Sequence, residues 1–284
     1  MTTRWLITGA GGMLGRDLVD SLAGADVLAL TRAELDITNE EAVAAAVSDR
    51  DVVVNAAAWT DVDGAESAEE EATRVNGGGP RVLALACREQ GAQLVQLSTD
   101  YVFDGDASSP YGETDPVAPR SAYGRSKAAG EAAVREVLPE SSYIVRTAWL
   151  YGEQGNNFVR TMLRLEQERD VLDVVDDQKG QPTWTCDVAA QIVALVNAQA
   201  APGIYHGTSS GEVTWFGLAR AVFASIGADP ARVHPSTTDR FPRPAPRPAY
   251  SVLGHDAWFD AGLAPIRPWG EALDQALPRL RKAS

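Results

Sequence analysis

Tyr123 and Lys127 stand four residues apart in the segment SAYGRSKAAGE. On a helix, this spacing places both side chains on one face. A tyrosine has an ordinary pKa near ~10, so it serves acid–base chemistry at neutral pH only when its phenolate is stabilised. An ammonium ~4 Å away, at an effective dielectric constant near ~20, contributes on the order of 4 kcal/mol, or about three pKa units. The pair predicts proton transfer at Tyr123 with Lys127 lowering its pKa; the alternative is a surface pair without function.

Hydroxyl side chains end the apolar run 93–98, in the segment LSTDYVFDG. Ligands of open parallel α/β sheets bind at the carboxyl ends of the strands. Thr99 is therefore expected to hydrogen-bond a substrate carbonyl or Tyr123 and to stabilise a developing oxyanion. The alternative is a threonine that caps the following turn.

Three glycines, Gly9, Gly12 and Gly15, follow the first apolar run and precede a helical pattern. Their spacing, G-x-x-G-x-x-G, differs from the G-x-G-x-x-G of many dehydrogenases, because Leu14 stands where the third glycine of that version would be. Glycines in a strand–turn–helix context permit a tight turn and a close approach of the backbone to a pyrophosphate. The segment predicts a dinucleotide site; the alternative is a glycine-rich turn without a ligand.

The residues after the second predicted strand, in LALTRAELD, bear on the choice of nicotinamide cofactor. An acidic residue at this place commonly binds the free ribose 2′-hydroxyl of NAD. Here Thr31 and Arg32 occupy it. Arg32 can pair with a 2′-phosphate, so we expect NADPH to be favoured over NADH. Two alternatives stay open: Arg32 as an ordinary loop arginine, and Glu34 or Asp36 reaching the ribose.

Positioning these residues requires a parallel sheet with crossover helices, and the first half of the chain has the matching alternation of short apolar runs and Ala-rich helical segments. Strands are predicted at 4–8, 26–30, 51–54, 93–98, 143–147 and 171–175, and helices at 13–23, 39–48, 65–75, 79–90, 121–137, 156–169 and 186–199. Proline and aromatic residues become denser after about residue 200, so loops that cover a ligand are expected there. The fold class is α/β, a Rossmann-like doubly wound parallel sheet with a smaller C-terminal substrate-binding lobe.

Composition excludes several classes of protein. The 284 residues carry a formal net charge of −14, and phosphate backbones are bound by cationic patches, so no nucleic-acid partner is expected. No apolar run approaches the ~18 residues of a membrane span. Without a leader-like apolar segment near residue 1, a cytoplasmic protein is expected. Cys87 and Cys186 show neither a disulfide nor a metal-ligand spacing, and are expected to be packing residues.

Seven segments together resemble one family: TGAGGMLG, VVVNAAAWTDVDGAE, LSTDYVFDG, SAYGRSK, RTAWLYGEQGNNF, DDQKGQPT and RPAPRPAYSVL. The chain resembles the extended short-chain dehydrogenase/reductases, most closely the dTDP-4-dehydrorhamnose reductase family, from about residue 5 to about 275. The resemblance implies NADPH-dependent reduction of the C4 ketone of dTDP-4-dehydro-β-L-rhamnose to dTDP-L-rhamnose, with NADH also possible. It implies a dinucleotide-binding domain over 1–148 plus about 183–207, and a nucleotide-sugar lobe over about 149–182 and 208–284.

Two alternative functions remain. One is another nucleotide-sugar reductase or epimerase of the same superfamily. The other is a non-catalytic, cofactor-binding regulatory subunit, against which the complete set of Thr99, Tyr123 and Lys127 argues, because a binding module needs no proton donor.

The resemblance also implies roles for single residues. For the cofactor these are Gly9, Gly12, Met13, Leu14 and Gly15 at the pyrophosphate, Arg32 at the 2′ position, Asp36 and Ile37 at the adenine, Ala57, Ala58, Trp59 and Thr60 along the cofactor, and Tyr123 and Lys127 at the nicotinamide end. For the sugar nucleotide they are Thr99, Asp100, Tyr101, Trp149, Asn157 and Arg247. Three of these have structural alternatives: Trp149 as a packed indole, Asn157 as a helix cap and Arg247 as a solvated cation. Arg243 competes with Arg247 for the diphosphate.

Some members of this family bind Mg²⁺ between two subunits through glutamates, and Asp17 stands at the first such position. Segments 187–193 and 279–284 offer no counterparts, so no metal ligands are assigned, and either a monomer or a homodimer is expected. His206, His234 and His255 have no ligand spacing and are interpreted as structural or exposed.

Overall fold

The alternating runs of the first half build a six-stranded parallel sheet in the computed structural model, which describes residues 2–282. The sheet has the order β10-β5-β4-β3-β1-β2. Its strands are β1 (Arg4–Thr8), β2 (Asp26–Leu30), β3 (Val52–Asn55), β4 (Gln93–Thr99), β5 (Ser142–Thr147) and β10 (Gly203–His206). The helices are α1 (Met13–Ser21), α2 (Glu40–Val47), α3 (Val62–Ala65), α4 (Glu69–Thr73), α5 (Gly79–Gln90), α6 (Ala122–Val137), α7 (Phe158–Glu168), α8 (Thr185–Asn197), α9 (Trp215–Ser225), α10 (Asp256–Asp260) and α11 (Trp269–Lys282).

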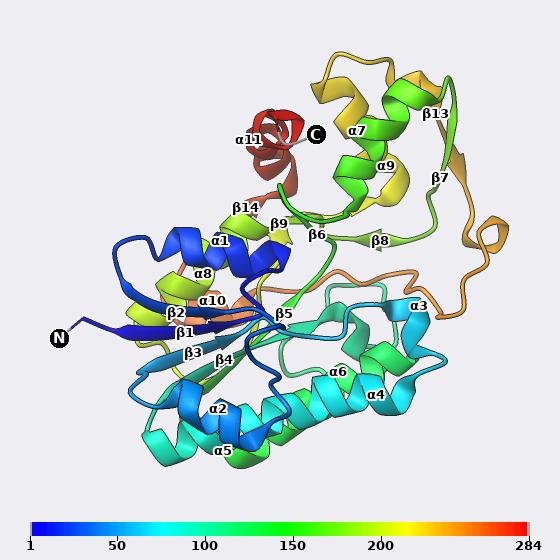
Figure 1. Cartoon of the computed structure of the whole chain (residues 1–284). Helices are drawn as coiled ribbons and strands as arrows, with labels where there is room; N and C mark the ends of the chain where they lie inside the picture. Colours follow the sequence, from blue (N-terminus) through cyan, green and yellow to red (C-terminus); the bar gives the residue numbers. More distant parts are fainter. Residues whose placement is uncertain (1, 283–284) are drawn as a thin grey trace.

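Helices cover both faces of this sheet (Figure 1). Helices α1 and α8 pack on one face, and α2, α5 and α6 on the other. Successive side chains of a strand point to opposite faces. Trp5 and Ile7 accordingly enter the cluster under α1 and α8, while Leu6 between them enters the cluster under α2 and α5. The predicted doubly wound architecture is confirmed.

The chain reverses direction across the sheet at β1. This strand pairs in parallel with β2 on one side and β3 on the other, so Leu6 lies between Leu28 and Val53. Open α/β sheets bind ligands in the crevice beyond the carboxyl ends of the strands, at such a switch point. The turn after β1 and the loop after β3 therefore meet at the expected cofactor position.

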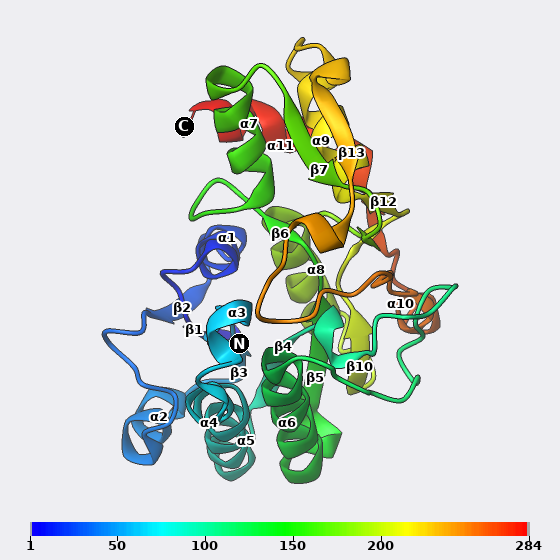
Figure 2. The ribbon, with the colours of Figure 1, turned by 90° about the vertical axis from the view of Figure 1, so that its right-hand side faces the viewer.

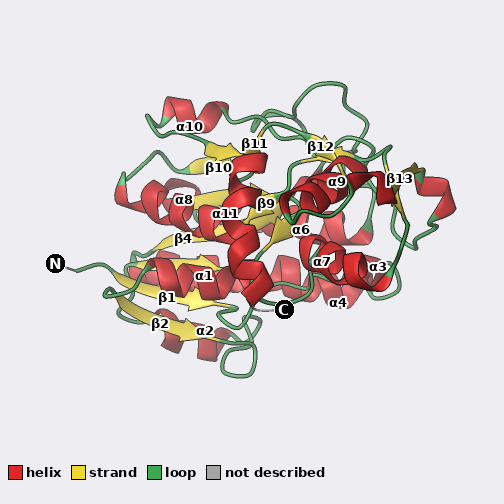
Figure 3. Cartoon of the chain, turned by 90° about the horizontal axis from the view of Figure 1, so that it is seen from above, coloured by secondary structure: helices red, strands yellow, loops and turns green. Residues whose placement is uncertain are grey.

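A second group of elements stands beyond the carboxyl ends of the sheet, where Figure 2 shows α7, α9, α11, β7 and β13 together. Figure 3 views α7, α9 and α11 from above. Their apolar side chains, including Met162, Phe223 and Leu277, form a third cluster, separate from the two clusters on the faces of the main sheet. Short strand pairs connect and border this group: β6 (Leu150–Tyr151) with β9 (Thr183–Trp184), β7 (Leu172–Val175) with β13 (Val233–Ser236), β8 (Lys179–Gly180) with β12 (Val213–Thr214), and β11 (Ser209–Ser210) with β14 (Ile266–Pro268).

The strand predicted at 171–175 is confirmed as β7, but it pairs with β13 outside the main sheet. The edge of the main sheet is filled by β10, which the sequence did not predict. Two other expectations about the elements are wrong. The region after residue 200 contains two helices of 11 and 14 residues, α9 and α11, instead of loops alone. The helix predicted at 65–75 is instead a short α3 that Asp61 caps by accepting a hydrogen bond from Gly64 N, a separate α4, and a π-helical turn, Arg74–Gly78.

Among residues 2–282, no helix is both long enough and apolar enough to cross a lipid bilayer.

Candidate active site

A cleft of about 310 Å³ lies beyond the carboxyl ends of β4 and β5. It brings together six of the residues predicted from the sequence: Thr99, Asp100, Tyr101, Tyr123, Trp149 and Arg247. They come from the end of β4, the first turn of α6, the loop after β5 and the C-terminal third of the chain. Larger hollows occur elsewhere on the surface, but the one of about 710 Å³ beside β10 contains none of these six residues.

Tyr123 lies in the first turn of α6, which begins where the Ser121 hydroxyl accepts a hydrogen bond from Gly124 N. Burial raises the pKa of Tyr123 to about 12; the charge of Asp100 adds to this and the Thr99 hydroxyl opposes it. At neutral pH the phenol is therefore protonated. That is the state a proton donor requires.

Lys127 follows one turn later and is buried, with 5% of its surface exposed. Its Nζ donates a 2.6 Å hydrogen bond to the carbonyl oxygen of Leu97 on β4. Burial lowers the pKa of Lys127 to about 8, while the charge of Glu131 opposes that shift. The two side chains share a helix, but the expected effect of Lys127 on Tyr123 is not among the causes of the shift: burial of the phenol raises its pKa, and Lys127 Nζ is held by the Leu97 carbonyl oxygen.

Thr99 and Asp100 lie where β4 ends, and both are buried. The Thr99 hydroxyl donates to Asp100 Oδ1 at 2.9 Å and accepts from Tyr101 N at 3.3 Å, so it caps the turn as well as facing Tyr123. Burial raises the pKa of Asp100 to about 6, although the Ser251 and Thr99 hydroxyls oppose the shift. Oδ2 of Asp100 has no hydrogen-bond partner of good geometry in the described chain. The carboxylate can accept a hydrogen bond from a ligand hydroxyl.

Trp149 combines the two roles left open for it, because its indole is packed and also lines the cleft. The ring stacks on Trp215 with 3.4 Å between centroids and 6° between planes. A Cβ on Gly180 would lie 2.5 Å from the indole, so only glycine fits there. Gln178 holds the second ring by accepting from Trp215 Nε1 at 3.1 Å. Trp215 and Gln178 also line the cleft, and sequence reasoning missed both; Gln178 stands inside the DDQKGQPT segment.

Residues 242–248, the proline-rich strap, cross from the second group of elements to α3 (Figure 2). Arg247 Nη2 donates to Asp63 Oδ2 at 2.8 Å, and Ala245 N donates to Asp63 Oδ1 at 3.2 Å. The Arg247 side chain is 20% exposed, whereas that of Arg243 is 62% exposed and 3.9 Å from the same carboxylate. Of the two arginines, only Arg247 is among the residues lining the cleft. Asp63 was not predicted, because its partner is far away in the sequence.

The turn after β1 fits a dinucleotide pyrophosphate. Gly9 has a φ of +68°, and a Cβ there would lie 2.6 Å from Ala57 N; a Cβ on Gly15 would lie 2.3 Å from the Gly9 carbonyl oxygen. Because neither glycine has a side chain, the start of α1 packs directly on the turn after β1, and that turn packs on the loop after β3. Helix α1 begins at Gly12 with no side-chain cap and no acidic residue in its first turn. Its leading N–H groups suit an anion.

Hydrogen bonds through Asn76 join the loop after β3 to α6. This loop contains Ala57, Ala58, Trp59 and Thr60. Trp59 N donates to Asn76 Oδ1 at 2.8 Å, and Asn76 Nδ2 donates to the Ser126 hydroxyl on α6 at 2.9 Å. The cofactor loop and the helix of Tyr123 are therefore held in one hydrogen-bonded network.

Around the end of β2, Ile37 is buried against Gly79, and Asp36 is exposed. The amide and hydroxyl of Thr38 hold the pKa of Asp36 below its ordinary value. Arg32 is exposed, and its charge acts on Asp36 and Glu71.

Asn157 is not brought to the cleft of Tyr123. It caps α7, where its Oδ1 accepts from Arg160 N at 3.0 Å, and its Nδ2 donates to Gly152 O at 2.9 Å. The expectation that it joins Arg247 at a diphosphate is not supported, because Asn157 is not among the residues that line the cleft with Arg247, and its Oδ1 caps the helix. Met13 of the glycine turn lies beside it, with 3.9 Å between Met13 Sδ and Asn157 Nδ2.

Asp17 does not lie in a metal-ligand cluster. Burial raises its pKa, and the nearby Thr185 and Cys186 side chains oppose the shift. The cation in this neighbourhood is Arg279, with Nη1 3.5 Å from Glu153 Oε1 and 3.7 Å from Cys186 Sγ. In residues 2–282 no three His, Cys, Asp or Glu side chains are grouped so that they could hold a metal ion.

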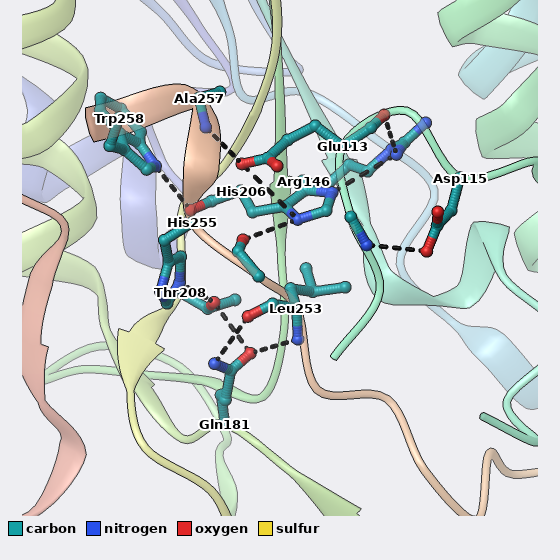
Figure 4. A network of polar contacts seen from close by, with 12 residues as sticks. Glu113, Asp115, Arg146, Gln181, His206, Thr208, Leu253, His255, Ala257 and Trp258 are labelled. Atoms are coloured by element: carbon teal, nitrogen blue, oxygen red, sulfur yellow. Dashed lines mark hydrogen bonds and ion pairs between the residues drawn. The ribbon is translucent and has the colours of Figure 1, made fainter. Parts of the chain in front are cut away.

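Buried polar contacts surround Arg146; those with His206 and Glu113 are shown in Figure 4, and the bonds to Glu131 tie β5 to α6. Arg146 on β5 binds Glu131 of α6 through two bonds of 2.9 and 2.8 Å, and the Ser98 hydroxyl donates to the same carboxylate at 2.5 Å. His206 Nδ1 lies 2.9 Å from the Gly254 carbonyl oxygen, which can only accept, and Nε2 faces Arg146. Burial and the Arg146 charge lower the pKa of His206 to about 3, so this ring is neutral.

The remaining histidines differ in exposure. His255 Nε2 lies 2.9 Å from the Thr208 hydroxyl in the same network, and His234 is exposed.

A doubly wound sheet with a glycine turn at its switch point, beside a Tyr-x-x-x-Lys helix and a threonine at the end of the adjacent strand, defines an oxidoreductase of the extended short-chain dehydrogenase/reductase class. The family model described as RmlD substrate binding domain matches residues 3–282. The chain belongs to the RmlD family.

Relatives and solved structures agree over nearly the whole chain. A Streptomyces niveus protein named dTDP-4-keto-6-deoxy-D-glucose reductase is 57% identical, over 99% of this chain and 98% of its own length. A Streptomyces griseus dTDP-4-dehydrorhamnose reductase is 55% identical, over 98% and 94%. The solved dTDP-4-dehydrorhamnose reductase of Bacillus anthracis, in complex with NADP, is 38% identical with a TM-score of 0.94, covering 98% of this chain and 99% of that one.

Proposed function

We propose that this protein reduces the C4 ketone of dTDP-4-dehydro-β-L-rhamnose to dTDP-L-rhamnose with NADPH. The observation that carries the proposal is the cleft that joins a protonated, half-buried Tyr123, the Thr99 hydroxyl and Arg247 beyond the carboxyl ends of the strands. The proteins of similar sequence named dTDP-4-dehydrorhamnose reductase, and the related structure that holds NADP, support the substrate and the cofactor.

When bound, NADPH supplies the hydride that reduces the ketone carbon. The residues that would hold it are Gly9, Gly12, Met13, Leu14 and Gly15 at the pyrophosphate, Asp36 and Ile37 at the adenosine end, Ala57, Ala58, Trp59 and Thr60 along its length, and Lys127 near the nicotinamide ribose. Tyr123 gives its phenolic proton to the C4 oxygen as that carbon gains the hydride. The product is a neutral alcohol, and the phenolate left behind is reprotonated from solvent.

Thr99, Asp100 and Trp149 position the sugar. The Thr99 hydroxyl assists the developing oxyanion, and Asp100 Oδ2 accepts a hydrogen bond from a ring hydroxyl. Arg247, held by Asp63, anchors the diphosphate, because a guanidinium offers paired N–H groups to phosphate oxygens. Remote binding energy of this kind orients the reacting carbon.

The larger organisation follows from these roles. Residues 1–148 with about 183–207 bind the dinucleotide, and about 149–182 with 208–284 bind the nucleotide sugar; the separate apolar cluster formed by α7, α9 and α11 supports this division. The protein acts in the cytoplasm as a monomer or homodimer on a small-molecule substrate.

A second substrate has a specific observation in its favour, since the Streptomyces niveus protein is named for dTDP-4-keto-6-deoxy-D-glucose. The two sugars are diastereomers of one 4-keto skeleton, and the Tyr123 chemistry at C4 is the same for both. The position of the ring hydroxyls against Asp100 and Trp149 decides between them.

The test is to incubate the protein with NADPH and each dTDP-4-keto sugar and to follow the absorbance of the reduced nicotinamide. Tyr123→Phe should lower kcat by at least ~10²-fold, the scale of a lost general acid, with the Kd of NADPH unchanged. Turnover of neither sugar by the wild-type protein contradicts the proposed function. Most of the turnover surviving in Tyr123→Phe contradicts the role of this residue alone.

A further inference from the structure

The end of β2 touches the glycine turn. Thr31 directly follows this strand, and its Cγ2 lies 3.4 Å from the point that a Cβ on Gly11 would occupy. In dinucleotide folds, this strand end faces the 2′ position of the adenosine ribose. Thr31 itself has no charge to offer, and both its amide and its hydroxyl donate to Glu34 Oε2, at 2.9 and 2.8 Å.

Glu34 makes this position unfavourable for a second anion unless a cation lies beside it. The two bonds from Thr31 hold the pKa of Glu34 below its ordinary value, so the carboxylate stays charged. A 2′-phosphate carries up to two negative charges at neutral pH. Its recognition therefore requires a fixed guanidinium or ammonium group at the junction of β2 and the turn.

Arg16 supplies such a group from the first turns of α1. Its Nε donates to the Gly11 carbonyl oxygen at 3.2 Å, which fixes the guanidinium beside the turn and leaves its other N–H groups available for a ligand. Side chains of a helix lean toward its N-terminus, so Arg16 reaches back over the glycines. Arg16 and Thr31 line one surface groove together with Ala10, and Asp17, Asp20 and Glu153 line the same groove. Arg16 nevertheless forms no ion pair with an acidic residue of the described chain, so its charge stays available to a ligand.

Arg32 is placed differently. Its charge acts on Asp36 and Glu71, on the side of β2 toward α4. There Arg74 already binds Glu71 at 2.8 Å. Arg32 is not among the residues that line the groove of Arg16 and Thr31.

We propose that Arg16 is the residue that selects NADPH over NADH, by pairing with the 2′-phosphate at the junction of Thr31 and Gly11. This extends the proposed function, on whose cofactor it rests, and it moves the selecting cation from the expected Arg32 to α1. Arg16 contributes nothing to NADH binding, because a ribose 2′-hydroxyl offers no charge to pair with.

The test measures the Kd of NADPH and of NADH separately by fluorescence titration of the wild type, Arg16→Ala and Arg32→Ala. Arg88→Ala is the matched control: it removes the same charge from the last turn of α5, near the amino end of β4 and so at the opposite edge of the sheet. We expect Arg16→Ala to weaken NADPH by about 10- to 100-fold, the scale of lost charge-assisted hydrogen bonds, and NADH by less than about twofold. Arg32→Ala and Arg88→Ala should each change both cofactors by less than about threefold. Arg16→Lys keeps the positive charge but not the paired N–H donors of a guanidinium, so it should bind NADPH more tightly than Arg16→Ala and less tightly than the wild type.

Two results would overturn the inference. One is an equal loss of NADPH and NADH affinity in Arg16→Ala, which would make Arg16 a support of the turn. The other is a selective loss in Arg32→Ala with Arg16→Ala unchanged, which would return the phosphate to Arg32. If the wild-type protein binds neither cofactor, the proposed function fails as well; this outcome is read from the wild type alone and is distinct from the other two.

Discussion

Asp63 is expected to control substrate binding without touching either the cofactor or the reacting carbon. Its carboxylate binds the proline-rich strap twice, through Arg247 Nη2 at 2.8 Å and Ala245 N at 3.2 Å. A bond to a charged partner contributes about 1.5–3 kcal/mol and a neutral backbone bond about 0.5–1.5 kcal/mol. The two side chains are 20% and 26% exposed, so solvent screening places the combined contribution near the lower end, about 2 kcal/mol.

Asp63→Ala should therefore raise the KM of the nucleotide sugar by roughly 10- to 30-fold, because about 2 kcal/mol corresponds to ~30-fold in the fraction of molecules with Arg247 in place. The kcat should fall as well, since the diphosphate then orients the ketone less firmly. Asp63→Asn keeps an oxygen that accepts from Ala245 N but removes the charge that binds Arg247. Its cost in binding free energy should therefore be about half that of Asp63→Ala. The assay is steady-state reduction of the 4-keto sugar at saturating NADPH, with the Kd of NADPH titrated in parallel and expected to be unchanged.

Arg243→Ala is the control for charge on the strap, because that side chain is 62% exposed and 3.9 Å from the same carboxylate. Its KM should change by less than about twofold. An unchanged KM in Asp63→Ala, with a raised KM in Arg247→Ala, would show that the prolines alone hold the arginine. An unchanged KM in both would place the diphosphate elsewhere.

Three further predictions concern the supports of the site. Arg146→Met leaves Glu131 buried without its partner and should cost about 3–5 kcal/mol of unfolding free energy in urea; adding Glu131→Leu should recover most of it, and no recovery would refute the buried-charge explanation. His206 has a pKa of about 3, below its ordinary 6.5, so the unfolded chain binds a proton that the folded chain excludes, and stability falls as the pH drops from 6.5 toward 3. This one proton makes the unfolding free energy change by about 1.4 kcal/mol per pH unit, and His206→Gln should remove that dependence. The raised pKa of Asp100, about 6, acts in the opposite direction in both proteins, so the slope of unfolding free energy against pH is compared between wild type and variant over pH 6.5–4.5. Equal slopes in the two proteins would contradict the prediction. Trp215→Leu removes a stacked ring worth about 0.5–1.5 kcal/mol and should raise the KM of the sugar about 2- to 12-fold, unless the pair only supports packing, in which case the KM stays constant while stability falls.

Local patterns predicted the cofactor half well. The strands 4–8 and 26–30 are found with the same bounds, and the glycine turn stands between β1 and α1 as its spacing required. This succeeds because strand, turn and helix are neighbours in the sequence, so each glycine is explained within a few residues. Tyr123 and Thr99 share one cleft for a related reason, since parallel strands bring their carboxyl ends to one edge.

What the sequence could not predict depends on contacts over long separations or on burial. The raised pKa of Tyr123 follows from its desolvation, which no spacing reveals. The role of Lys127 in lowering that pKa stays a prediction. Asp63 and Arg247 are 184 residues apart. Helix α9 had a readable signal, with Leu218, Ala219, Val222 and Phe223 buried at helical spacing, but the proline-rich segment that follows favoured an interpretation as loops.

The course of the chain between the sheet and the second group of elements has an evolutionary consequence. The chain leaves the sheet at β6, returns with α8 and β10, leaves again at β11, comes back through the strap and α10, and leaves last at β14. If the second group of elements binds the sugar nucleotide as proposed, it cannot be exchanged for another group as one contiguous segment, because no single cut separates it from the main sheet. New sugar preferences must then arise by replacement of individual side chains around the cleft. The two Streptomyces relatives fit that route: they carry different reductase names, yet both align with this chain over at least 98% of its length.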